Sequence, residues 1–442
     1  MQLSGHYSVR RLAITSIPMI GMMIITSIYS IVDGFFVANF AGTTEFAALN
    51  IVWPAIAIVS AAGLMIGTGG SALVSKTLGE GDVEKADTIF TQLVRVCIEL
   101  GIVTAVLLFI FMKPVVLALG AEGKMIPLAV TYGRIVVVAM PLFIVQMAFQ
   151  SFYMTAERPE LGTWMSILCG VLNIALDAVF IIGFGWGLTG AALATAISIA
   201  AGGIYPLVFF SSRRNNTHLQ FVKTETRDWK SILKSCSNGM SEYVGNVALS
   251  VVSIGYNIQL MKYIGENGVS AYGIIMYVGF ILGAVFIGYN LCVSQVIAYN
   301  YGAGNKEELK SLLLKSLGLI AITGVVLTSI AELTAPLLAS VFVGYDPELC
   351  ALTEHALRIY MLSFLLCGFN FFCSAWFTAL NNGLVSAVAA FTRTMVFELT
   401  TVFVLPSIIG IDGIWSSVCV AEALAFIMAC SLIWAFRKRY LQ

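Results

Sequence analysis

The sequence predicts an all-α integral membrane protein with twelve transmembrane helices in two six-helix lobes, related by a pseudo-two-fold axis along the membrane normal. The first observation is composition. The 442 residues are 59% hydrophobic and only 11% charged, whereas an average soluble domain has roughly 25% charged residues. The second is a series of apolar runs long enough to cross a bilayer. The third is a repeat, because the second half returns to features of the first at a nearly constant spacing.

The apolar runs are separated by Gly, Pro, Asn and charge clusters. Several exceed the roughly 20 residues that a bilayer requires, so tilt, kinks or extension into water are expected. The predicted spans cover residues 12–38, 48–76, 88–112, 127–155, 161–183, 187–211, 232–262, 269–300, 311–342, 350–380, 384–409 and 413–436.

An even number of spans places both termini on one side of the membrane. If the N-terminus is cytoplasmic, seventeen of the 24 Lys and Arg residues, Arg213 and Arg214 among them, fall in cytoplasmic segments and only three fall outside. Positive charges accumulate in cytoplasmic loops. The sequence therefore predicts that both termini are cytoplasmic.

The most polar connection, residues 211–230, divides the chain into halves. It predicts an N-terminal lobe (1–211), a cytoplasmic linker (212–230) and a C-terminal lobe (231–442). The offset that pairs Gly79 with Gly302, which we call the repeat offset, also pairs other glycines of the two halves. An offset one position longer pairs Arg134 with Arg358. Two repeats with an even number of spans insert the same way up, with a substrate path expected between them.

A polar pair interrupts the fifth span. Asn173 and Asp177 are four residues apart in an apolar run, so both project from one helix face. An ionised carboxylate inside a bilayer costs at least about 2.5 kcal/mol, and it usually faces a bundle interior or a wet cavity. The counterparts of Asp33, Asp177 and Thr195 in the second half carry no charge. This asymmetry predicts an ion site in the N-terminal half, with Thr195 placing a hydroxyl beside Asp177.

Each of these residues has an ordinary structural alternative. Asp33 could be an interfacial carboxylate that reaches water or caps the next segment. Asp177 could make a satisfied structural hydrogen bond. Thr195 could bond to its own helix backbone. Pro18, in the first span, lacks an amide hydrogen and makes the helix easier to bend, which could move Asp33.

Other charges compete as candidate sites. Arg95 and Glu99 are spaced as a local i,i+4 ion pair. Arg134 and Arg358 recur in both halves, which favours a scaffold role. Four carboxylates of the second half remain alternatives, Glu242 foremost because it lies in the span that corresponds to that of Asp33: Glu242, Glu332, Glu398 and Glu422.

A cavity for organic cations could be lined by aromatic, Met and amide side chains, although each of these alone is more often ordinary packing. The candidates are Tyr29, Gln150, Tyr153, Met154, Tyr256, Tyr289 and Asn290. The three histidines are scattered and the nine cysteines form no C-x-x-C pair. We therefore expect no enzyme, no cofactor and no metal other than a coupling ion.

The combination of these features resembles the multidrug and toxic compound extrusion (MATE) family over essentially the whole chain. The features are Pro18 and Asp33 in the first span, the G-x-G-D-x-x-K-A pattern from Gly79, the turn at 156–159, and Asn173-x-x-x-Asp177 followed by Gly190 and Thr195. The resemblance is to bacterial branches with an ion site in the N-terminal lobe. It assigns ion coupling to Asp33, Asn173, Asp177 and Thr195, with Na⁺ possible at the last three, and the helix bend to Pro18.

The resemblance implies an antiporter that exports amphipathic, often cationic drugs in exchange for inward H⁺ or Na⁺ by alternating access. It implies a multi-pass protein of the bacterial inner membrane, with a single chain as the functional unit and drug-like molecules and lipid as its partners. The formal net charge of zero gives no sign of a nucleic-acid partner. The alternative is a flippase for lipid-linked precursors, which would need a cavity ringed with arginine. Other branches place essential carboxylates in the second half, where Tyr256 and Tyr289 offer none.

Overall fold

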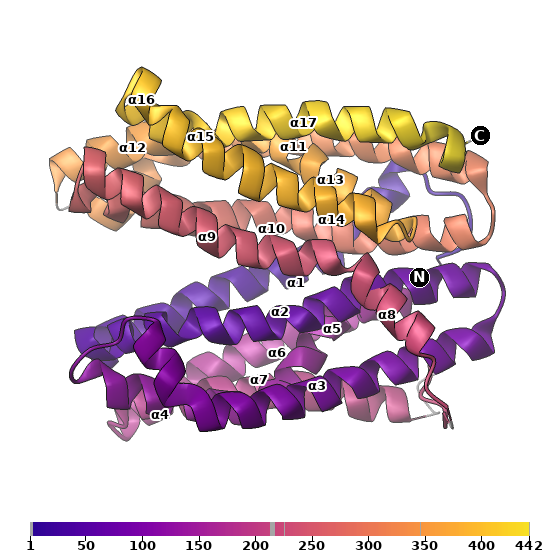
Figure 1. The fold of residues 1–442 in the computed structure, drawn as a ribbon, viewed down its shortest axis with the longest axis horizontal. Helices are drawn as coiled ribbons and strands as arrows, with labels where there is room; N and C mark the ends of the chain where they lie inside the picture. The colour runs from indigo at the N-terminus through magenta and orange to yellow at the C-terminus, as the bar shows by residue number, and fades with distance from the viewer. Residues whose placement is uncertain (1–2, 213–216, 225, 345, 442) are drawn as a thin grey trace.

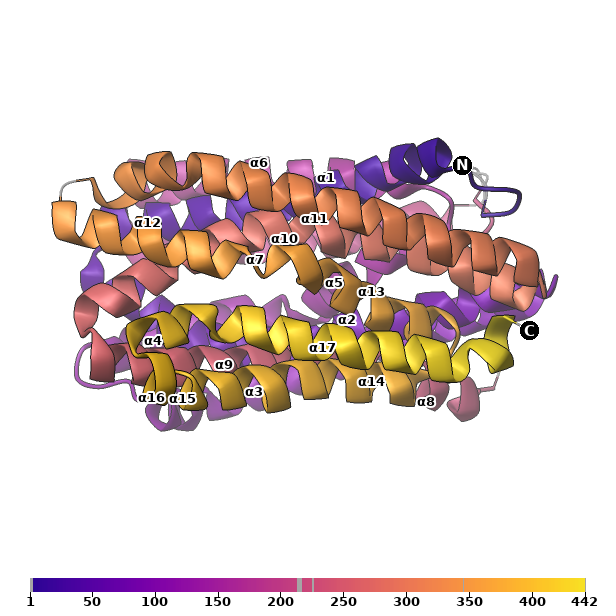
Figure 2. The same ribbon diagram turned by 90° about the horizontal axis from the view of Figure 1, so that it is seen from above.

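The computed structural model describes residues 3–212, 217–224, 226–344 and 346–441. Arg213, Arg214 and part of the predicted linker 212–230 lie outside the described residues. The described chain is nearly all helical and contains no strand. Most helices run along one direction, as Figures 1 and 2 show.

The first half contains seven α-helices and two π-helical segments. They are α1 (Val9–Phe36), η1 (Val37–Ala41), α2 (Thr43–Gly79), α3 (Val83–Ala118), α4 (Met125–Val138), α5 (Met140–Thr155), α6 (Pro159–Asp177), η2 (Ala178–Gly183) and α7 (Gly187–Ser211).

The second half repeats this order after an additional short helix. Its elements are α8 (Trp229–Asn238), α9 (Met240–Tyr263), α10 (Glu266–Gly302), α11 (Lys306–Val343), α12 (Pro347–Met361), α13 (Phe364–Ala379), α14 (Gly383–Phe391), η4 (Thr392–Glu398), α15 (Leu399–Val404), α16 (Pro406–Ile409) and α17 (Ile411–Leu441).

The prediction of twelve spans is confirmed. Among the described residues, ten helical stretches are long and apolar enough to cross a membrane, and two bent helix pairs bring the number to twelve. The predicted span 127–155 consists of α4 and α5, bent by 62°, and the span 350–380 consists of α12 and α13, bent by 47°. Pro141 lies in the first turn of α5, where proline is tolerated and the preceding helix ends.

The predicted seventh span, 232–262, differs from the structure at its start. Residues 229–238 form the separate helix α8, which is amphipathic and carries Lys230 and Lys234, and the span itself is Met240–Tyr263. Gly239 joins the two helices, and a Cβ there would meet the carbonyl oxygen of Met65 at 1.9 Å. The close contact with α2 therefore fixes the break at a glycine.

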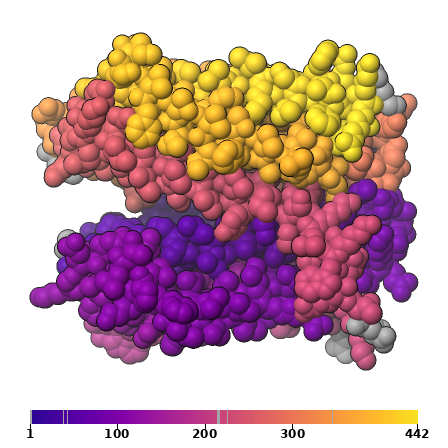
Figure 3. All heavy atoms as spheres, viewed as in Figure 1, coloured from indigo at the N-terminus to yellow at the C-terminus, as the bar shows by residue number. Residues whose placement is uncertain are grey.

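The two halves lie side by side with both termini at the same end of the helices (Figures 1 and 2). We call this the termini end. A cleft separates the halves at the opposite end, which carries α4, α12 and α16, while the termini end is closed (Figure 3). The structure therefore has a V shape that opens away from the termini.

Repeated glycines bring the halves together near the termini end. A Cβ on Gly79 of α2 would meet the carbonyl oxygen of Tyr299 at 2.0 Å, and a Cβ on Gly302 of α10 would meet the carbonyl oxygen of Lys76 at 1.9 Å. Only glycine permits such backbone contact. The glycines that reveal the repeat in the sequence thus form the contact between its two copies.

The repeated arginines have the scaffold role that duplication predicts. Arg134 Nε donates to the carbonyl oxygen of Phe109 at 3.1 Å, and Arg358 Nη1 donates to that of Glu332 at 3.1 Å. Phe109 and Glu332 are themselves counterparts at the repeat offset. Each arginine thus ties the fourth span of its half to the third.

The described residues form two hydrophobic cores. One consists mainly of residues of the first half and the other mainly of residues of the second. Leu12, Met19 and Met22 of α1 pack into the core of the second half, so α1 joins the halves as well as belonging to the first. The lobe boundaries at 211 and 231 stay a prediction.

Candidate functional site

Asp33 lies in the last turn of α1, where the helix changes its hydrogen-bond pattern. The N–H of Val37 bonds to the carbonyl oxygens of Asp33 and Gly34, and the chain continues as η1. Single π-helical turns inside α-helices are frequent at functional sites. The Asp33 Oδ1 atom is buried and has no hydrogen-bond partner among the described residues.

Asp177 occupies the matching place on α6. It is the last α-helical residue before η2, and Asn173 precedes it by one turn. The Asp177 side chain is fully buried, and both carboxylate oxygens lack a hydrogen-bond partner within the described chain. Asp33 lies close enough to Asp177 and Asn173 for the three side chains to interact electrostatically. The segments η1 and η2 also pack against each other.

Two hydroxyl groups complete the cluster. Thr195 in α7 is buried, and its Oγ1 makes no hydrogen bond to another described residue. Tyr132 in α4 is also buried, and it interacts with Thr195, Asp33 and Asp177. Four helices, α1, α4, α6 and α7, therefore bring polar groups to one place in the core of the first half. We call Asp33, Tyr132, Asn173, Asp177 and Thr195 the carboxylate cluster.

The cluster contains two carboxyl groups without a basic partner among the described residues. No Lys or Arg in the described part of the chain is among the groups that interact with Asp33 or Asp177. Two buried carboxylates close together disfavour double ionisation, and a proton or a small cation would relieve their repulsion. Carboxylate, amide and hydroxyl oxygens are the ligands that hard cations such as Na⁺ prefer. The arrangement can bind and release one small positive charge.

The structural alternatives for Asp177 and Thr195 do not match their contacts. Asp177 faces neither lipid nor an arginine. Thr26 and Thr68 each donate to the carbonyl oxygen four residues earlier at 2.8 Å, as membrane threonines commonly do, whereas the Thr195 hydroxyl is left without a partner among the described residues. Asp33 is partly exposed although its Oδ1 atom is buried, so the interfacial alternative for Asp33 stays open. Their roles in ion coupling stay predictions.

Tyr132 was not predicted from the sequence. A signal was nevertheless present, because the offset that pairs Arg134 with Arg358 also pairs Tyr132 with Ala356. Asp33 and Asp177 were singled out because their counterparts in the second half lack a carboxylate. A search for tyrosines whose counterparts lack a hydroxyl would have found Tyr132.

Pro18 lies inside α1, which continues as one helix past it. The Thr163 hydroxyl of α6 donates to the Pro18 carbonyl oxygen at 2.6 Å. The proline is therefore held by the helix that carries Asp177. The predicted bend of α1 at Pro18 concerns a conformational change and stays a prediction.

The cavity candidates differ in burial and contacts, and their role in lining a cavity stays a prediction. Met154 and Tyr256 are fully buried, Tyr153 packs beside Phe149, and the Tyr289 hydroxyl donates to Ser316 Oγ at 2.8 Å. The remaining candidates, Tyr29, Gln150 and Asn290, are buried or partly exposed side chains on α1, α5 and α10. In this conformation Met154 and Tyr256 contribute packing rather than an open surface.

The carboxylates of the second half have other partners. Arg393 donates from Nε to Glu422 Oε1 at 2.9 Å, and Asn370 Nδ2 donates to Glu422 Oε2 at 2.5 Å. Glu332 pairs with Arg358 at 3.0 Å. Glu242 lies in the first turn of α9, where a helix N-terminus favours negative charge.

Glu398 is the remaining candidate carboxylate of this half, and it is buried. It lies at the end of η4, near the Arg393–Glu422 pair. The cluster in the second half therefore includes its own arginine, unlike the carboxylate cluster of the first. Among the described residues no group of three His, Cys, Asp or Glu side chains is placed to hold a metal ion.

These observations define a multi-pass helical membrane protein made of two like-oriented repeats, an architecture of membrane transporters. The MatE family profile matches residues 18–179 and again residues 243–404. The chain belongs to the MATE family, and the same family unit occurs once in each half.

The chain is similar to multidrug export proteins. It is 25% identical over 425 residues to the multidrug export protein MepA of Staphylococcus haemolyticus, covering 96% of this chain and 93% of MepA. It is 23% identical over 426 residues to MepA of Staphylococcus aureus, with the same coverage.

Solved structures share the fold. One, described as the outward-facing conformation of a multidrug resistance MATE family transporter of the MOP superfamily, has a TM-score of 0.92 at 21% identity and covers 99% of this chain and 98% of its own. A second, a MOP superfamily transporter from Pyrococcus furiosus, has a TM-score of 0.89 at 22% identity, with 98% of each chain covered.

Proposed function

We propose that the protein is a secondary active antiporter that exports amphipathic, often cationic organic compounds in exchange for inward H⁺ or Na⁺. The observation that carries the proposal is the proximity of Asp33 to the fully buried Asp177, with no basic partner for either carboxyl group in the described chain. Family membership and the similarity to multidrug export proteins support the substrate class.

The coupling follows from electrostatics. A proton on Asp177, or Na⁺ among Asp177, Asn173 and Thr195, cancels a charge that the surrounding helices do not compensate. The π-helical segments η1 and η2 lie beside these residues, and both contact α7. A change of charge therefore acts where α1, α6 and α7 can repack. Each charge that moves inward through the membrane potential supplies roughly 2.3 kcal/mol per 100 mV.

The proposed orientation places the termini end in the cytoplasm. The seventeen basic residues of the positive-inside count support this orientation, as does the position of both termini at one end (Figure 1). The cleft of Figure 3 would then open to the outside of a bacterial inner membrane.

A flippase would need arginines that face the cleft and hold pyrophosphate. The arginines of the spans are engaged elsewhere. Arg393 pairs with Glu422, while Arg134 and Arg358 bond to backbone carbonyl oxygens. Antiport of organic compounds therefore fits these contacts better than flipping of a lipid-linked pyrophosphate.

The experiment is dye transport in inverted membrane vesicles, driven in turn by a Na⁺ gradient and a pH gradient. Asp177→Asn and Asp33→Asn should abolish transport driven by the gradient that couples, while the protein stays folded. Asp412→Asn is the matched control, because Asp412 is exposed and pairs with His355 at the open end. Full gradient-driven transport by Asp177→Asn would refute the proposal.

A further inference from the structure

Two non-helical segments cross the termini end. The N-terminal strap, residues 3–8, leads into α1 of the first half and is held by α11 of the second. The linker strap, residues 217–224 and 226–228, leads into α8 and α9 of the second half and is held by α3 of the first. In each case the segment that enters one half contacts the third long helix of the other.

The N-terminal strap is bound through its backbone and its side chains. Glu308 Oε1 accepts from the Tyr7 N–H at 2.8 Å, and Glu308 Oε2 lies 2.6 Å from His6 Nδ1. Lys315 donates to the Tyr7 carbonyl oxygen. The side chains of Leu3 and Tyr7 are 1% and 0% exposed, although the first residues of most chains are poorly ordered.

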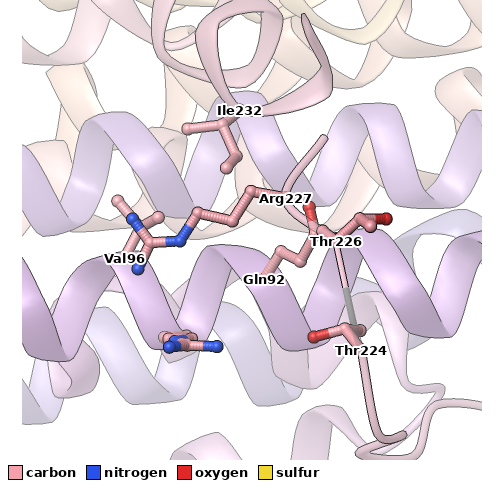
Figure 4. Close-up of a pocket in the computed structure, with 7 residues that line it drawn as sticks. Gln92, Val96, Thr224, Thr226, Arg227 and Ile232 are labelled. Carbon is pink, nitrogen blue, oxygen red and sulfur yellow. The ribbon is translucent and has the colours of Figure 1, made fainter. Parts of the chain in front are cut away.

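The linker strap repeats this arrangement. Gln92 Nε2 donates to the Thr226 carbonyl oxygen at 2.8 Å, and the Asp228 N–H donates to Gln92 Oε1 at 2.9 Å. Gln92 lies with Thr226 in the small pocket of Figure 4. Phe221 stacks on Phe90 with ring centroids 5.0 Å apart. Gln92 and Lys315 are counterparts at the repeat offset. Each half therefore holds one strap with the residue at the equivalent position of its third long helix.

One carboxylate joins the two straps. Glu157 Oε1 accepts from the Leu3 N–H at 2.5 Å, and Glu157 Oε2 lies 3.2 Å from His218 Nε2. Glu157 follows α5 and has a φ of 59°, a left-handed conformation that is rare for glutamate. The turn thus directs a partly buried carboxylate of the first half to both straps.

We propose that the two straps form a latch that holds the termini end shut, and that the N-terminal strap must leave Glu157 or Glu308 before this end can open. The proposal rests on the alternating access of the proposed function. Glu157 belongs to the first half and Glu308 to the second. Leu3 and Tyr7 are four positions apart, so their backbone nitrogens cannot lie more than roughly 14 Å apart, and this limits how far Glu157 and Glu308 can separate while both contacts persist.

The test measures the separation of the halves directly. Spin-labelled amino acids replace Glu84 and Glu307, which are exposed counterparts at the termini end of α3 and α11. Because these labels are not attached through thiol groups, the native cysteines can stay in place. The distance distribution is recorded for the full chain in lipid nanodiscs.

Glu157→Gly removes the carboxylate and accommodates the left-handed backbone. It should raise the ratio of long to short distances roughly tenfold, because each lost hydrogen bond to a charged group favoured the closed end. Glu160→Ala is the control, because Glu160 is an exposed carboxylate three residues further on, in the first turn of α6. The control should leave the distances unchanged.

A second pair guards against a folding defect at Glu157. Glu308→Ala should lengthen the distances in the same way, whereas Lys310→Ala, an exposed position on the same helix, should not. Unchanged distances in both Glu157→Gly and Glu308→Ala would overturn the latch. The spin-label distances do not depend on drug export. If the distances change as expected but dye transport is driven by neither gradient, only the proposed function is refuted.

Discussion

Gln295 Nε2 donates to Ser71 Oγ at 2.9 Å, across the boundary between the two halves. Gln295 Oε1 also accepts from Ser75 Oγ at 3.0 Å and from Thr155 Oγ1 at 3.2 Å. The side chain is 1% exposed. One glutamine of α10 therefore satisfies hydroxyl groups from both α2 and α5 where the halves are closed.

Gln295→Leu should lower stability and loosen the closed end. The substitution removes one of the hydrogen bonds of each of three buried hydroxyl groups, which keep other partners, and each lost hydrogen bond costs about 0.5–1.5 kcal/mol. Ser294→Ala removes one contact of 3.3 Å and should have a small effect. Thermal unfolding in detergent measures both. Equal melting temperatures for Gln295→Leu and the wild type would contradict the bridging role.

Thr195→Val should weaken ion coupling without unfolding the protein. Valine keeps the shape of threonine but lacks the hydroxyl that faces the carboxylate cluster, and a hydrogen bond to a charged group contributes about 1.5–3 kcal/mol. The ion concentration for half-maximal dye transport should therefore rise at least roughly tenfold. Thr68→Val is the control, because the Thr68 hydroxyl bonds within its own helix. A Thr195→Val protein with wild-type ion dependence would remove Thr195 from the site.

Tyr132→Phe should have a similar effect. Its hydroxyl is the group that interacts with Thr195, Asp33 and Asp177 together. Its loss should raise the required ion concentration by roughly tenfold while the melting temperature stays near that of the wild type. Tyr277→Phe, on an exposed face of α10, is the control. A large loss of stability with unchanged ion dependence would assign Tyr132 to packing alone.

Gly79→Ala should force α2 and α10 apart. The added Cβ would lie 2.0 Å from the Tyr299 carbonyl oxygen, and overpacking of this kind costs about 1–3 kcal/mol. Gly318→Ala is the matched control, since a Cβ there meets no atom within 4 Å, and alanine should be neutral or slightly stabilising in a helix. Thermal unfolding compares the two. If Gly79→Ala were as stable as Gly318→Ala, separating α2 from α10 would cost no free energy of folding.

Asp228→Ala should loosen the start of α8 in a pH-dependent way. The Asp228 carboxylate accepts from the Ser231 hydroxyl and N–H, and these bonds lower the pKa of Asp228. A lowered pKa means that the stabilisation is present above the unfolded pKa and is lost as the pH falls through the folded pKa. An N-cap contributes about 0.5–2 kcal/mol, and exposure to water keeps this example small. Amide exchange in α8 should therefore differ between Asp228→Ala and the wild type at neutral pH and converge in acid.

The sequence predicts the spans and the repeat because both follow from requirements that are visible locally. A bilayer needs about 20 apolar residues for each crossing, and the glycines of the closed end must recur in both halves. The break at Gly239 depends on close packing against α2, which no local pattern reveals.

The site was predictable in part. Asp33 and Asp177 stand out because a charge in lipid needs a reason. Tyr132 and the segments η1 and η2 do not stand out, because tyrosine is common in membrane helices and a π-helical turn depends on neighbouring helices. The buried ends of the N-terminal strap were also hidden, since Leu3 and Tyr7 gain their contacts from Glu157 and Glu308, which are far away along the chain.

The glycine contact has a consequence for the origin of the molecule. Gly79 touches Tyr299, and Gly302 touches Lys76. Gly302 is the counterpart of Gly79 and Tyr299 is the counterpart of Lys76, so the two contacts are equivalent. A reciprocal contact of this kind is isologous, as at the two-fold axis of a symmetric dimer. An ancestor of half the length could therefore have formed this interface as a homodimer before gene fusion, after which each copy was free to acquire its own ionisable groups.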